Sequence, residues 1–287
     1  MLSKSLPVIC FLLFSNLSTC LSCVDTLNVD VDVTGQGADC VYIFTRPKKM
    51  DGSCPSLVEA AKDLYNEHSN SYEDLIAYYP FNSDNLDHST NSYHGTPSDE
   101  NSMYSEDAVC GRSRFFDGTS KVDIEAFRSF EWGSAFSVSV WFKRTGQFGN
   151  YQGIVNNGYY TTGSWEIRMG RENSGSKLGG GVITGDSSAT WDYNQASASG
   201  NEWHHVVMSY DGEAGSLTYY LDGVAQSGNS DCCSGPILVR DTAVTIGQAG
   251  AGKTNEYFYG FIDEKGFLLI GLARSHFGHF MQPLSAK

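Results

Sequence analysis

Between about residues 75 and 271, several stretches alternate apolar and polar side chains with a period of two. The stretch 136–142 (FSVSVWF) sets Phe, Val and Trp between serines, and 205–210 and 217–221 behave similarly. In a β-strand successive side chains point to opposite faces, so this period gives one buried face and one solvent face. The pattern therefore predicts amphipathic strands over these three stretches.

Clusters of Gly, Asn, Asp and Ser interrupt this pattern about every ten residues. Asp222-Gly223 and Asp211-Gly212 have the composition of tight turns, because both residue types tolerate a left-handed backbone. Gly179-Gly180-Gly181 is typical of a short loop. About 200 residues with this pattern and almost no helix signal suffice for two packed sheets. The sequence predicts an all-β fold, a two-sheet antiparallel sandwich over residues 75–271.

The first 22 residues have the order of a secretory signal peptide. Lys4 precedes the apolar run 6–14, and small polar residues lead to Ser22, after which we expect cleavage. The apolar run is about half the length of a membrane span, which needs roughly 20 residues. We therefore expect a secreted, extracellular protein without a membrane partner.

Residues 23–74 differ in character from the sandwich. The run 27–33 alternates like a strand, and Ser56 and Glu59 have the spacing of a capping box at the start of one short helix. So short a segment buries little apolar surface. We expect it to form a small acidic unit in front of the sandwich, stabilised by disulfides or by docking.

Cysteine usage supports an oxidising compartment. The chain has eight cysteines, two of which would leave with the signal peptide. The remaining even number predicts disulfides rather than zinc, because no Cys/His cluster has ligand spacing. The sequence does not choose among the pairings of these six cysteines, which are Cys23, Cys40, Cys54, Cys110, Cys232 and Cys233.

Charge is concentrated at the front of the expected mature chain. The whole chain has a formal net charge of −14, and residues 23–111 carry 16 acidic and 4 basic residues, a net charge of −12. Such a field repels nucleic acid and attracts calcium or a basic surface, or else it serves solubility alone. We expect no nucleic-acid partner.

Segments spread along the sandwich resemble one known family. They are 77–81 (AYYPF), 87–95 (DHSTNSYHG), 116–119 (FDGT), 136–142, 201–207 (NEWHHVV), 219–223 (YYLDG) and 259–264 (YGFIDE). In this order and spacing they are similar to the LamG-like jelly-roll family of the concanavalin A-like lectin/glucanase superfamily. After Glu264 the sequence departs from the family's pattern, and 272–287 form an atypical tail.

The resemblance implies a structural calcium site. In the family, the Asp of an early loop and the Asp of an Ile-Asp-Glu segment near the end come together because the first and last strands are neighbours. In this chain these are Asp87 and Asp263, with main-chain oxygens near Tyr93 completing a shell of oxygen ligands. The alternative is that both aspartates form turns without a metal. The resemblance also implies that Trp203 is a core residue.

Other chemistry has weaker support. His204 and His205 are neighbours in a predicted strand, so their side chains cannot share one site. Asp123 and Glu125 share a strand face, but the paired-carboxylate pattern of the superfamily's hydrolases is incomplete. Tyr159-Tyr160 and 191–193 (WDY) lie in expected loops, where exposed rings would suit a sugar.

These observations predict a secreted, non-catalytic adhesion or extracellular-matrix protein. Its sandwich would hold a matrix protein or a glycan, and its acidic front suits a calcium mineral surface such as that of a calcified skeletal matrix. The alternative is a calcium-dependent, carbohydrate-binding lectin, and a glycoside hydrolase is disfavoured.

Overall fold

The computed structural model describes the central part of the chain. The described residues are 76–99, 103–146, 151–170, 177–185, 189–192, 197–222, 224–226, 229–230, 233–250 and 255–267. They belong to one compact unit, Asp74–Gly271. The segments 1–22, 23–74 and 272–287, with their predicted signal peptide, helix and tail, lie outside them.

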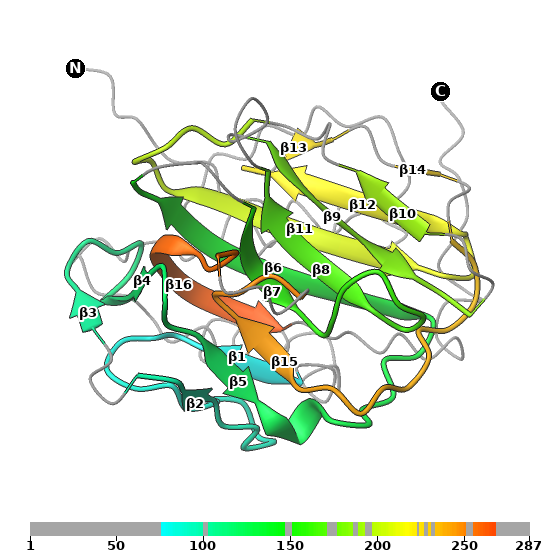
Figure 1. Ribbon diagram of the computed structural model, residues 1–287, viewed down its shortest axis with the longest axis horizontal. Coiled ribbons are helices and arrows are strands. Elements are labelled where there is room, and N and C mark those ends of the chain that lie inside the picture. Colours follow the sequence, from blue (N-terminus) through cyan, green and yellow to red (C-terminus); the bar gives the residue numbers. More distant parts are fainter. Residues whose placement is uncertain are drawn as a thin grey trace, which may run out of the picture. The chain divides into compact units, whose positions relative to one another are not determined.

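Two antiparallel sheets build this unit, as the sequence predicts (Figure 1). The first, sheet A, has the order β13-β12-β11-β6-β16-β4-β3, with β1 paired to β16 and β14 paired to β12. Its strands are β1 (Ala77–Tyr79), β3 (Met103–Ser105), β4 (Ser113–Asp117), β6 (Ala135–Arg144), β11 (His204–Asp211), β12 (Ser216–Leu221), β13 (Val224–Ala225), β14 (Asn229–Ser230) and β16 (Tyr259–Phe267).

The second, sheet B, has the order β10-β9-β8-β7-β15-β5-β2. Its strands are β2 (Thr96–Pro97), β5 (Val122–Ile124), β7 (Gln152–Asn156), β8 (Trp165–Met169), β9 (Leu178–Ile183), β10 (Ala189–Asp192) and β15 (Val244–Ile246). One short 3-10 helix, η2 (Glu125–Phe127), follows β5. The jelly-roll sandwich is thus confirmed.

The strands predicted from alternation are confirmed as β6, β11 and β12. Along β12 the side chains alternate between half-buried and buried, as a strand with one face on a core requires. Asp222 has a φ of +50° at the turn between β12 and β13. Asp211 accepts hydrogen bonds from the next turn's main chain, so both predicted turns are present.

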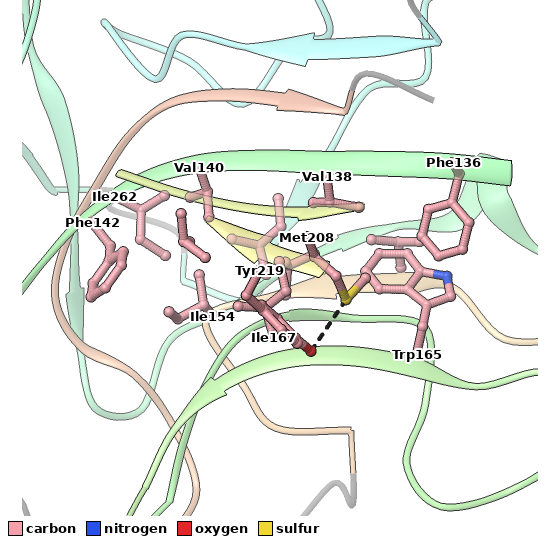
Figure 2. Packing of buried hydrophobic residues seen from close by; sticks show 14 of the residues in the cluster. Phe136, Val138, Val140, Phe142, Ile154, Trp165, Ile167, Met208, Tyr219 and Ile262 are labelled. Carbon is pink, nitrogen blue, oxygen red and sulfur yellow. Dashed lines mark hydrogen bonds between the residues drawn. The ribbon is translucent and has the colours of Figure 1, made fainter. Parts of the chain in front are cut away.

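The core lies between the sheets (Figure 2). From sheet A, Phe136, Val138, Val140 and Phe142 of β6 project into it, and from sheet B, Trp165 and Ile167 of β8 meet them. The Tyr219 hydroxyl reaches the Met208 sulfur at 3.4 Å inside this layer. Burying a large apolar side chain contributes roughly 1.5–3 kcal/mol, so these alternating positions supply most of the driving force.

Glycines in β9 correct one prediction. The triplet expected to be a loop, Gly179 to Gly181, lies inside a strand. Gly180 has a φ of +137°, and a Cβ there would run into the carbonyl oxygen of Glu166 on β8. A residue with a side chain would therefore separate β8 from β9, because only glycine permits this approach.

The last strand continues beyond the point where the sequence departs from the family pattern. β16 runs to Phe267, with a bulge between Asp263 and Gly266, and its end pairs with β1. The resemblance implied that the first and last strands are neighbours, and this pairing confirms it. Within the described residues no helix is long and apolar enough to cross a membrane.

Candidate functional site

A continuous row of residues crosses sheet B on the face turned away from the core. In β8, Glu166 alternates with the core residues Trp165 and Ile167. The register of the neighbouring strands identifies the residues that share this outer face with Glu166, because directly paired residues lie on the same face. From β9 to β2 the row consists of Gly181, Glu166, Asn156, Thr245, Asp123 and Thr96.

Next to this row, an arginine is held between two tyrosine rings. The guanidinium of Arg168 lies 4.5 Å from the ring centre of Tyr151 and 4.7 Å from that of Tyr159. Both rings are half-buried, whereas the adjacent Tyr160, whose ring lies 5.6 Å from Tyr159, is 56% exposed. Cation–π contacts fix the orientation of the rings. We call Tyr151, Tyr159, Tyr160 and Arg168 the tyrosine face.

An ion pair with Glu166 also holds Arg168 in position. Arg168 Nη1 lies 3.3 Å from Glu166 Oε2, and both side chains are almost fully buried. The main-chain N–H of Gly250 donates to Glu166 Oε1 at 2.6 Å. Burial raises the pKa of Glu166 to about 7, and the charge of Glu256 adds to this, although Arg168 and Gly250 act in the opposite direction. The register places Gly181 and Gly179, without side chains, beside Glu166 and Arg168.

The loop that presents Tyr159 and Tyr160 is braced from a second loop. Arg240 Nη1 donates to the Thr161 hydroxyl at 2.6 Å and to the Thr162 carbonyl at 2.9 Å. At the base of the loop, the Asn157 side chain donates to Gly163 and accepts from the main chain of Trp165. These bonds restrict the loop, and a preorganised loop loses less entropy when it binds a ligand.

Asp87 is enclosed by hydrogen-bond donors. Its carboxylate accepts the main-chain N–H groups of Tyr78, Ser89 and Tyr93 at 2.8–2.9 Å and the Ser89 hydroxyl at 2.8 Å. The Tyr93 carbonyl, an expected calcium ligand, accepts the Tyr79 hydroxyl. Asp87 therefore ties its own loop to strand β1.

Asp263 makes a different connection. On β16, its Oδ2 accepts the main-chain N–H groups of Val109 and Cys110 at 2.7 and 3.0 Å. In the described part of the chain, no three His, Cys, Asp or Glu side chains are grouped so as to hold a metal ion. Calcium at Asp87 and Asp263 stays a prediction.

Two of the six predicted disulfide cysteines lie in the described residues. Cys110 and Cys233 are both buried and both disulfide-bonded. Cys23, Cys40, Cys54 and Cys232 lie outside the described residues, so complete pairing stays a prediction.

The two histidines lie on opposite faces of β11, as predicted. His204 is paired with Phe142 of the core side, and its Nδ1 lies 2.7 Å from Asp222 Oδ2. His205 stacks on Trp141 at 4.8 Å, and its Nε2 lies 2.8 Å from the Ser139 hydroxyl. Each ring thus has a structural partner.

Three local expectations need correction. Trp203 is half-buried rather than a core residue, and its indole N–H donates to Asp107 at 3.0 Å. Asp123 and Glu125 do not share a strand face, because β5 ends at Ile124 and Glu125 begins η2, where it pairs with Arg128. Trp191 and Asp192 belong to β10 rather than to a loop, and residue 193 lies outside the described residues.

Sequence reasoning identified Tyr159 and Tyr160 as ligand candidates but missed Tyr151, Glu166 and Arg168. In the stretch 165–169 (WEIRM), Glu and Arg occupy the polar positions of an amphipathic strand and look like solvent-facing residues. The only available signal was the glycine run 179–181, which removes side chains beside them.

Comparison with known proteins identifies the family. The Laminin_G_3 model, described as the concanavalin A-like lectin/glucanases superfamily, matches residues 116–266. No curated protein matches the chain.

Among solved structures, domain 4 of AbnA, an extracellular GH43 arabinanase from Geobacillus stearothermophilus in complex with arabinotriose, is similar. It has 19% identity and a TM-score of 0.51 over 67% of this chain and 91% of that chain. The binding domain of Paraclostridial mosquitocidal protein 1 has 14% identity and a TM-score of 0.53, over 69% of this chain and 50% of that one. At such identities these similarities show the fold alone. Because the family model matches more than half of this chain, the chain belongs to the Laminin_G_3 family of the concanavalin A-like lectin/glucanases superfamily.

Proposed function

We propose that the protein is a non-catalytic glycan-binding module of a secreted adhesion or matrix protein, and that the tyrosine face binds the sugar. The observation that carries the proposal is the stacking of Arg168 between Tyr151 and Tyr159, with Tyr160 exposed beside them. Aromatic rings offer an apolar face and a polar hydroxyl, which match the apolar and hydroxyl-bearing sides of a sugar ring.

The surroundings of the tyrosine face favour binding over catalysis. Hydrolysis of a glycosidic bond needs two carboxyl groups that flank the bond, one of them as general acid. Glu166 has a raised pKa, but its side chain has no exposed surface, and an arginine and a main-chain N–H occupy it. We assign Glu166 to the positioning of Arg168.

The AbnA domain supports this proposal in one respect. That protein shares the fold and holds an oligosaccharide, arabinotriose. A sandwich of this kind can therefore serve as a sugar-binding module. The identity of the sugar for this chain is part of the proposal to be tested.

Replacing Tyr160 with Ala should weaken glycan binding about two- to twelvefold, because the lost aromatic contact is worth roughly 0.5–1.5 kcal/mol. The measurement is a glycan array that includes arabinotriose, followed by titration calorimetry with the best glycan. Val224→Ala, which truncates an exposed apolar side chain on β13, is the matched control and should bind like the wild type.

Two results would contradict the glycan proposal. One is that the wild-type protein binds no glycan on the array, and the other is that Tyr160→Ala keeps the wild-type affinity. Repeating the array with a chelator tests the lectin alternative, because a calcium-dependent lectin loses binding there.

The secreted and matrix parts of the proposal rest on the sequence of residues 1–22 and on the oxidised state of Cys110 and Cys233. Disulfides persist in extracellular compartments and are rare in the cytosol. The excess of acidic residues in 23–111 adds biomineralization as one form of matrix role, because carboxylates concentrate calcium at a mineral surface.

A mineral role predicts selective retention of the acidic region. Residues 23–74, which carry 10 acidic and 4 basic residues, should as a peptide bind calcium carbonate crystals at moderate salt more strongly than the sandwich of residues 75–271 does, measured as the fraction retained after washing. Equal and weak retention of both would leave the acidity as a solubility feature and remove the mineral role.

A further inference from the structure

Large apolar side chains form a partly exposed strip on the outer face of sheet A. Phe261 on β16 is paired with Phe115 on β4 and with Lys143 on β6, and Phe115 is in turn paired with Met103 on β3. Because directly paired residues share a face, these side chains lie side by side. We call the following residues the aromatic strip: Met103, Phe115, Trp203, Tyr259 and Phe261.

The strip is accessible and its rings are in mutual contact. Met103 is 47% and Tyr259 39% exposed, and the other three side chains are half-buried. Phe115 lies 5.0 Å from Phe261 and 5.5 Å from Tyr259 between ring centres, and Trp203 lies 6.4 Å from Phe261. Exposed aromatic rings are unfavourably solvated, and these rings do not belong to the core. A contiguous exposed apolar patch of this kind is typical of a binding surface.

Two glycines make room for the exposed ring of Tyr259. A Cβ at Gly146 would lie 2.8 Å from that ring, and one at Gly118 would lie 3.1 Å from it. Side chains at these positions would push the ring away or cover it. The chain thus keeps this ring uncovered on the sheet.

The strip has a polar, hydrogen-bonding border. Asp107 accepts the indole N–H of Trp203 at 3.0 Å and lies 2.7 Å from Lys143 Nζ, which in turn lies 6.0 Å from the centre of the Phe261 ring. These bonds lower the pKa of Asp107, although its slight burial acts in the other direction, so the pair stays ionised and cancels in charge. Asp117, which is paired with Tyr259 on the same face, adds a carboxylate to this border, so an acidic partner is disfavoured there.

The accessible area is narrow. On the same outer face, the neighbouring side chains Ser139, His205 and Asp263 are all at most 5% exposed, and Trp141 beside them is half-buried. A stable protein interface uses roughly 20–30 residues a side, far more than the strip offers. A strip of rings with a polar border matches one extended chain of sugar rings, whose apolar faces stack on aromatic rings while their hydroxyls reach the border.

We propose that the aromatic strip binds a single extended polysaccharide chain with flat, apolar sugar faces. It is a second binding surface, on different residues and on the other sheet from the tyrosine face. The proposal is therefore independent of the proposed function, and either can fail alone.

The test is retention of the full chain on insoluble cellulose and on insoluble chitin, two polymers of flat sugar chains. We expect retention of the wild type on at least one polymer, and at least a fivefold higher dissociation constant for the double variant Met103→Ala, Tyr259→Ala. Val224→Ala, which truncates an exposed apolar side chain outside both the strip and the tyrosine face, is the matched control and should be retained like the wild type. Thermal melting verifies that each variant is folded.

The salt dependence of retention and the oligomeric state distinguish a polysaccharide from a charged partner or a second copy of the chain. Stacking on apolar rings is insensitive to ionic strength, so retention should be similar at 0.1 and 1 M NaCl. Three outcomes overturn the proposal: no retention of the wild type on either polymer, equal retention of the strip variant, or sedimentation showing a dimer that the strip variant loses. The last outcome would assign the strip to a second copy of the chain.

Discussion

Replacing Asp87 with Ala should lower the free energy of unfolding by about 3–5 kcal/mol. The carboxylate satisfies three main-chain N–H groups and one hydroxyl, and a buried donor left without its partner costs roughly 1–3 kcal/mol. The loss detaches the loop after β1 from the strand, because Asp87 is bonded to Tyr78 as well as to its own loop. Urea unfolding measures it.

The matched control is Asp84→Ala in the same loop. Asp84 accepts the main-chain N–H of Leu86 at 3.0 Å in an exposed position, so its removal should cost much less. If Asp87→Ala and Asp84→Ala unfold at the same urea concentration, the structural role of Asp87 is wrong.

The same variants test the calcium prediction. A ligand that binds only the folded protein adds about 2.7 kcal/mol at a hundredfold excess over its Kd. If calcium binds through Asp87 and Asp263, the wild type gains this stability with calcium, and Asp87→Ala and Asp263→Ala do not. A wild type that melts alike with calcium and with chelator leaves both aspartates as hydrogen-bond acceptors alone.

Acid should weaken the sandwich through His205. Burial lowers the pKa of this imidazole from 6.5 to about 4, against the smaller opposing effect of Asp222. The neutral ring is therefore preferred in the folded state, and its contribution is present above pH 6.5 and lost as the pH falls towards 4. The shift corresponds to about 3 kcal/mol. We expect the stability advantage of the wild type over His205→Gln to shrink by this amount between pH 7 and 4.

The difference between wild type and variant is the appropriate measure, because Glu166 has the opposite effect. Its pKa is raised to about 7, so its contribution favours the folded state at low pH and is lost as the pH rises from 4.5 to 7. His204→Gln is the control with the opposite sign. Burial alone would lower the pKa of His204, but the hydrogen bond and charge of Asp222 raise it overall, so His204 stabilises the fold at low pH. Parallel pH curves for wild type and His205→Gln would contradict the assignment.

The sequence allowed prediction of the fold because one face of each main strand is buried. The alternation of apolar and polar residues along 136–142 and 217–221 indicates which face of each strand is buried, and Asp222-Gly223 indicates the turn. The helical turn at Glu125 could not be predicted in this way. Asp123 and Glu125 fit a strand equally well, and the burial of Phe127 in this turn depends on packing that the local pattern does not contain.

The candidate site was only partly predictable, because it depends on which strands are adjacent. Tyr159 and Tyr160 stood out as aromatic residues in a polar loop, but their partner Arg168 comes from β8. Trp203 illustrates the same limit. The family resemblance placed it in the core, whereas the pairing of β16 with β4 and β6 creates an aromatic surface that receives its ring.

The position of β16 has a consequence for synthesis on the ribosome. It is the last strand among the described residues, yet it lies between β4 and β6 and also pairs with β1, where Ala77 meets Phe267, 267 − 77 = 190 residues later. At about 5–20 residues per second, translation separates these two partners by roughly 10–40 s. During this time β1, β4 and β6 lack their β16 partner, so the nascent chain exposes unpaired strand edges, which favour aggregation, until β16 emerges and pairs with them.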